Sequence, residues 1–173
     1  MAVAASHSLI FRILNNASEK NLGMEGYPAE YGIYLSIIKA NKLHKLSKGE
    51  FKFVEPSKSN KELSALHNEF NKHIKSKEEP TSLNELYDLF SKQPYGIKKG
   101  LIPILLASFY MTNEGSFALY NTDEQGKEFL ITDYNKRICE RFISTPETLK
   151  MMFVKIEGEK QTLLDQFKGY VEN

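Results

Sequence analysis

The stretch that most constrains the fold is residues 93–111, QPYGIKKGLIPILLASFYM. It opens with a proline–glycine turn signal and the basic pair Lys98 and Lys99, and continues as an almost unbroken apolar run. Apolar side chains are unfavourable in water, so this run must be covered by the rest of the chain or by a partner. Segment 101–111 is shorter than the roughly 20 residues needed to span a bilayer. We therefore expect an interior helix and no membrane partner.

Composition is typical of a packed globular protein, with 41% hydrophobic and 12% aromatic residues among 173. This length suits one medium domain or two small lobes that share a core. The formal net charge is only +1. Dedicated nucleic-acid binders usually carry a clear basic excess, so the charge balance argues modestly against one, although a local basic face remains compatible with it.

Cys139 is the single cysteine, which excludes an internal disulfide framework and favours a reducing, cytoplasmic compartment. We expect this thiol to be packed rather than reactive. Residues 1–6 lack the charged region and apolar core of a secretion signal. They are typical of a short leader before a natural sequence that begins near His7, and the chain is then expected to be a piece of a longer protein.

Residues 7–79 are expected to form a helical lobe with one short strand. The predicted elements are helices at 8–20 and 29–39, a strand at 51–54, and a helix that follows the capping-box pair Ser59 and Glu62. The polar, charged stretch 75–80 then marks the lobe boundary.

Residues 80–173 are expected to form a winged-helix-like lobe with an added strand and a C-terminal helix. The predicted elements are a helix capped by Ser82 and Glu85, a helix at 97–112, strands at 117–120 and 128–131, a helix that is capped by Thr132 or Asp133 and ends near 144, a strand at 151–156 and a helix at 162–171. Pro103 predicts a late start or a kink in the 97–112 helix. The fold class is thus α+β and mostly helical.

A nucleic-acid interpretation would use the two central strands as a wing and helix 97–112 as the reading helix. A helix that enters a groove must present polar or basic side chains, whereas this one is apolar on most of its circumference and is typical of an interior helix. The candidate nucleic-acid-binding residues are all basic: Lys98, Lys99, Lys127, Lys136, Arg137 and Arg141. A solvated charged surface is the favoured explanation for them.

Catalytic, cofactor-binding and metal-binding residues are not expected. His67 and His73 are six residues apart, so they do not share a helix face as an i, i+4 metal pair does. Neither a G-x-S-x-G nucleophile motif nor a G-x-x-x-x-G-K-[ST] phosphate loop occurs. A small enzyme is the weakest alternative, and it would need a deep pocket lined by histidines or by Glu25 and Glu30.

Several short segments together resemble a known region. They are 26–28, 34–36 and 39–40 in the first half, and 94–96, 99–103, 105–107, 117–120 and 146–156 in the second. Together they resemble a non-catalytic, winged-helix-like region of very large bacterial ATPases, some of which are encoded among phage-defence or DNA-modification genes. The resemblance implies a module cut from such a protein. Its matched residues are architectural, and no ATPase activity transfers because no Walker motif is present.

The leading functional hypothesis is a non-enzymatic interaction or scaffolding module of a larger bacterial protein, a phage-defence ATPase. Its partners would be other domains or subunits of that assembly. The alternative is a winged-helix module that binds duplex DNA.

Overall fold

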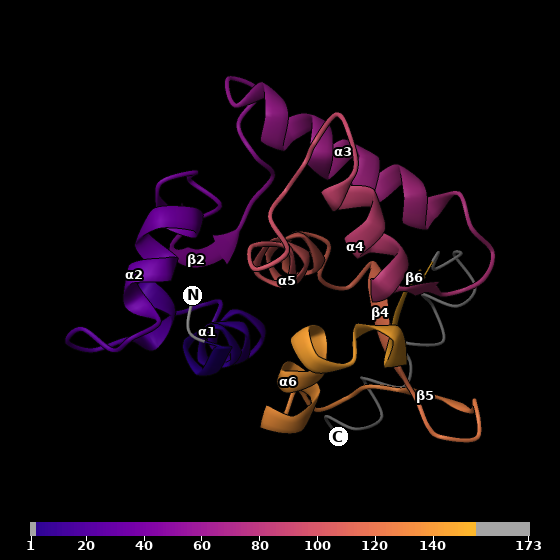
Figure 1. Ribbon diagram of the computed structural model, residues 1–173. Coiled ribbons are helices and arrows are strands. Elements are labelled where there is room, and N and C mark those ends of the chain that lie inside the picture. Colours follow the sequence, from indigo (N-terminus) through magenta and orange to yellow (C-terminus); the bar gives the residue numbers. More distant parts are fainter. Residues whose placement is uncertain (1–2, 155–173) are drawn as a thin grey trace, which may run out of the picture.

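The computed structural model describes residues 3–154 and shows an α+β fold, as the sequence predicts (Figure 1). Helix α5 (Ile102–Thr112) lies at the centre and is drawn almost end-on in Figure 1, with α1 on one side and α3 and α4 on the other. It packs against α1, α4 and β2. The fold is therefore organised around the apolar run.

Helix α5 begins at Ile102 rather than at residue 97, and Pro103 lies in its first turn. The late start predicted from Pro103 is confirmed, because a proline in the first turn removes no hydrogen bond that the helix would otherwise form. Every residue from Ile102 to Met111 is buried, which confirms the predicted interior helix. Within residues 3–154, no helix is long and apolar enough to cross a membrane.

Helix α1 (Val3–Asn15) begins earlier and ends earlier than predicted. Ala5 and Ser6 are buried, so residues 3–6 are part of the folded structure. A short 3-10 turn, η1 (Lys20–Gly23), follows the helix.

A second helical segment and a hairpin complete the N-terminal part. The segment starts as α2 (Tyr31–Ile33) and continues as a π-helix, η2 (Tyr34–Lys39). Strands β1 (His44–Ser47) and β2 (Glu50–Phe53) then pair antiparallel around a turn at Gly49, whose φ is +83°. The strand predicted at 51–54 is confirmed as β2. Strand β1 is additional to the one strand predicted here, because its polar sequence gives little strand signal.

Helices α3 (Lys61–Lys75) and α4 (Leu83–Ser91) have side-chain caps. The cap of α3 is Asn60, whose Oδ1 accepts from the Leu63 N–H at 3.3 Å, and the predicted Ser59 cap is therefore wrong. Ser82 does cap α4, as predicted, by accepting from the Asn84 N–H at 3.2 Å.

The C-terminal part of the described chain contains a four-stranded antiparallel sheet in the order β3-β6-β4-β5. Its strands are β3 (Thr81–Ser82), β4 (Phe117–Thr122), β5 (Glu128–Leu130) and β6 (Leu149–Phe153). Helix α6 (Lys136–Ser144) and the 3-10 turn η3 (Pro146–Thr148) connect β5 to β6. The cap of α6 is Asn135, not Thr132 or Asp133 as predicted. The helix predicted at 162–171 lies outside the described residues.

One continuous cluster of buried apolar residues joins the two predicted lobes. Phe70 of α3 and Phe109 of α5 belong to it, and their ring centroids are 5.5 Å apart. The two parts of the chain thus share a core, while the division at residue 80 and the winged-helix likeness stay predictions.

Candidate interaction surface

The β4–β5 hairpin carries exposed apolar side chains on the edge of the larger sheet. Phe129 and Leu130 of β5 are 46% and 56% exposed. The turn is closed by Asp123, whose Oδ1 accepts from the N–H groups of Gln125 and Lys127, both at 2.9 Å. Among residues 3–154, β5 pairs only with β4, so no described strand occupies its outer edge. An open edge with exposed apolar residues is a template for contact with another chain.

Helix α6 presents charged side chains on two flanks. Residues four apart share a helix face, so Arg137 and Arg141 lie on one flank and Lys136 and Glu140 on the other. Arg137 and Arg141 face the hairpin and line a cavity of about 760 Å³ with Asn121 and Phe129. Arg141 donates a hydrogen bond to Oδ1 of Asn121. Lys136 instead lines a separate cavity against α1. We call residues 121–130 together with Arg137 and Arg141 the hairpin surface.

The charge of the hairpin surface is mixed rather than uniformly basic. Asp123 and Glu124 line the same cavity as Arg137 and Arg141. Lys127 lies over the Phe129 ring, with its Nζ 5.2 Å from the ring centroid. Mixed charge around an apolar centre is the usual composition of a protein-binding surface, whereas a DNA-binding surface is usually dominated by positive charge.

Lys98 and Lys99 lie away from this surface, before the N-terminal end of α5. Tyr95, just before them, lines a cavity with the first turns of α3. At the other end of α5, the Tyr110 hydroxyl lies 2.6 Å from that of Tyr134, just before α6. An 11-residue helix is roughly 16 Å long, so the length of α5 separates Lys98 and Lys99 from the end of α5 that contacts Tyr134. The six predicted basic residues therefore do not gather at one site.

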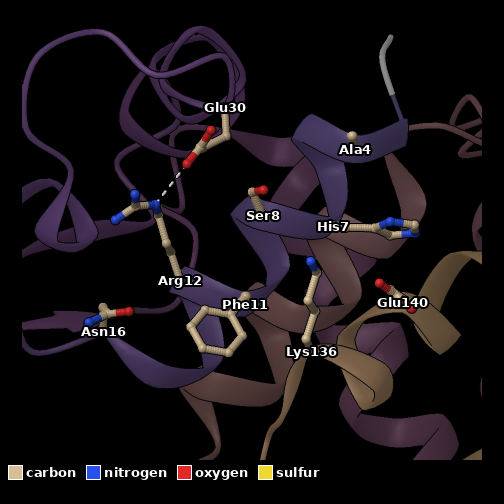
Figure 2. Close-up of a pocket in the computed structure, with 9 residues that line it drawn as sticks. All are labelled: Ala4, His7, Ser8, Phe11, Arg12, Asn16, Glu30, Lys136 and Glu140. Atoms are coloured by element: carbon tan, nitrogen blue, oxygen red, sulfur yellow. Dashed lines mark hydrogen bonds and ion pairs between the residues drawn. The ribbon is translucent and has the colours of Figure 1, made fainter.

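A third cavity, of about 600 Å³, lies between α1 and α6 (Figure 2). At one end Arg12 Nε donates to Glu30 Oε1 at 2.8 Å, and the Glu30 side chain is only 9% exposed. The sequence does not predict this cavity, because the apolar stripe of α1 indicates only its core-facing side and residues 1–6 are typical of a leader. Two pairs of i, i+4 neighbours, His7–Phe11 and Ser8–Arg12, form a second stripe on α1 and are the sequence signal that could have indicated this cavity.

The buried histidines have structural surroundings. His44 Nε2 donates to the Ala17 carbonyl at 2.7 Å, so its Nδ1 accepts from the Tyr34 hydroxyl at 3.0 Å. His67 packs edge-on against Phe109, with ring centroids 4.8 Å apart. Burial lowers the pKa of both imidazoles, which favours their neutral forms.

His73 is on the surface, where its Nε2 donates to Glu85 at 3.0 Å. Lys77 also donates to Glu85, at 3.0 Å. The hydrogen bond from His73 is the largest cause of the lowered pKa of Glu85. Across residues 3–154, no group of three or more His, Cys, Asp or Glu side chains is placed to hold a metal ion.

Cys139 is fully buried in α6, which confirms the predicted packed thiol. Burial raises its pKa to about 12. The group is therefore a thiol at neutral pH rather than a nucleophilic thiolate.

Comparison of the chain with known protein families, with curated proteins and with solved structures found no match. The resemblance to a region of large bacterial ATPases therefore stays a prediction.

Proposed function

We propose that this chain is a non-enzymatic interaction module that binds other protein domains or subunits through the hairpin surface. The observation that carries the proposal is the pair of exposed apolar residues Phe129 and Leu130 on a sheet edge that no described strand occupies. An extended segment of a partner can add to such an edge through main-chain hydrogen bonds, while side-chain pockets give specificity. The adjacent cavity with Arg137 and Arg141 would supply the polar rim.

The scaffolding part of the proposal rests on the interior position of α5. Residues from Ile102 to Met111 are buried among α1, α4 and β2, so α5 supplies a rigid frame and no binding side chains. We propose that the frame serves a larger cytoplasmic assembly, a bacterial phage-defence ATPase, on the strength of the resemblance described above. The gene neighbourhood tests this: an ATPase domain in the same reading frame or beside it is expected, and a gene with neither contradicts it.

Photo-crosslinking in the native host tests the docking surface. A photoreactive phenylalanine replaces Phe129 in one variant and Leu46 in the control, because Leu46 is 59% exposed but lies on β1, in the other sheet. We expect a recurrent crosslink to one neighbouring domain or subunit from position 129 only. Equal crosslinking from both positions, or none from position 129, contradicts the proposal.

Duplex-DNA binding is the second candidate, because Arg137 and Arg141 share one cavity with the hairpin. Phosphate contacts release counterions, so true DNA binding weakens steeply as salt rises. A titration against labelled duplex at low and moderate salt decides between the two. No binding at low salt removes the DNA candidate. Salt-sensitive binding that is lost in R137A/R141A and kept in the charge-matched control K98A/K99A would replace the protein-docking proposal.

A further inference from the structure

The cavity between α1 and α6 has the size and composition of a small-molecule site. Its volume of about 600 Å³ falls within the roughly 300–1,000 Å³ of known ligand pockets. Phe11 forms an apolar wall and is 39% exposed. In Figure 2, Lys136 extends from α6 toward α1, and the carboxylate of Glu140 lies below the His7 ring.

The charges around this cavity are balanced but only partly paired. Arg12 and Glu30 neutralise each other at one end through their 2.8 Å ion pair. Lys136 and Glu140 are four residues apart on α6, yet neither forms an ion pair within residues 3–154. A lysine that precedes a glutamate by four residues is the less favourable orientation for a helix pair. One ammonium and one carboxylate thus remain available to a ligand.

His7 lines the cavity, but through atoms other than its Nε2. The Nε2 atom of His7 is inaccessible to solvent and has no hydrogen-bond partner among the described residues. Because solvent cannot reach this atom, it contributes no hydrogen bond to a ligand in the cavity.

We propose that the cavity binds a small zwitterion with an aromatic group, of the aromatic α-amino acid class. Its carboxylate would pair with Lys136, its ammonium with Glu140, and its ring would pack on Phe11. A simple anion would face the carboxylate of Glu140, and a simple cation would face the ammonium of Lys136, both unpaired within residues 3–154. A ligand with both charges avoids each repulsion. This proposal does not depend on the docking function.

Isothermal titration calorimetry with three matched probes tests the ligand class on the full chain. L-phenylalanine carries both charges, 3-phenylpropionate lacks the ammonium, and phenethylamine lacks the carboxylate. Loss of one charge-assisted hydrogen bond weakens binding about tenfold or more, so we expect L-phenylalanine to bind at least about tenfold more tightly than either analogue. Absence of L-phenylalanine binding at millimolar concentration, or equal affinity for all three probes, overturns the proposal.

Matched variants test the location. We expect K136M and E140Q each to weaken L-phenylalanine binding about tenfold, whereas K92M and E147Q, which change exposed charges outside the cavity, leave it unchanged. Circular dichroism checks that every variant is folded. Unchanged affinity in folded K136M and E140Q, or an equal loss in the two controls, overturns the assignment.

Discussion

Helices α5 and α6 follow each other closely in the chain and have opposite roles. Helix α5 is apolar all round and buried from Ile102 to Met111, so it offers no side chain to a partner. Helix α6 buries Ile138, Cys139 and Phe142 along one stripe and keeps its charged residues on the flanks. In a winged-helix interpretation α5 has the position of the helix that reads DNA, yet only α6 has charged side chains that a partner could contact. Which side chains a helix exposes around its circumference, more than its order in the chain, decides whether it can bind a partner.

The largest expected effect comes from a matched pair of phenylalanines, one in each environment. Phe109 of α5 is 1% exposed and Phe129 of the hairpin is 46% exposed. F109A should lower the free energy of unfolding by about 3–5 kcal/mol, because it leaves a core cavity. F129A should cost less than about 1 kcal/mol. Urea denaturation measures both, and equal losses would remove the distinction between interior and surface.

A smaller effect is expected from the contact that fastens α6 to the core. The Tyr87 hydroxyl of α4 donates to the Phe142 carbonyl of α6 at 2.7 Å, in a buried position. Y87F leaves that carbonyl without its partner and should lower the free energy of unfolding by about 1–3 kcal/mol. Y27F is the control, because Tyr27 is 89% exposed. A loss in Y27F as large as in Y87F would contradict the role given to this bond.

The pH dependence of stability follows from the histidine beside α5. Burial lowers the pKa of His67 in the folded state, so below about pH 6.5 the unfolded chain binds the extra proton. The free energy of unfolding should therefore fall as the pH drops from 7.5 to 5, with His44 contributing in the same direction. Urea denaturation at the two pH values measures this. H67Q should reduce the difference, and stability that rises toward pH 5 would contradict the prediction.

The smallest effect is expected at a surface contact that involves neither α5 nor α6. Glu85 accepts from His73 and Lys77, but its side chain is 44% exposed. Solvent screens such a pair, so E85Q should cost less than about 1 kcal/mol, and the cost should shrink in high salt. Thermal unfolding at two salt concentrations checks it. A large, salt-insensitive loss would mean that this contact is structural.

The parts of the fold that depend on local chemistry were predictable from the sequence. The apolar run and Pro103 predicted an interior helix with a late start, and the structure has one. Strand β1 was missed, because it is short and polar and becomes a strand only by pairing with β2. Two helix caps also differ from the prediction: Asn60 caps α3 in place of Ser59, and Asn135 caps α6 in place of Asp133. All of these residue types are good caps, so the sequence alone does not show which of two neighbours accepts the hydrogen bond.

The candidate site was less predictable because it depends on distant packing. Arg137 and Arg141 meet the hairpin, whereas Lys98 and Lys99 lie beyond the other end of α5. Basic character alone does not distinguish these positions. The cavity against α1 needs residues more than a hundred positions apart, such as Phe11 and Lys136, and no local pattern encodes that approach.

Native-state hydrogen exchange tests the central claim, that α5 is interior and the hairpin is the accessible surface. The account predicts that amides of α5 within 105–111 exchange only through global unfolding, with a protection free energy equal to that of the whole domain. Amides of the turn at 124–127 should exchange orders of magnitude faster, because this turn is exposed. Exchange in α5 as fast as in the hairpin turn would contradict the account.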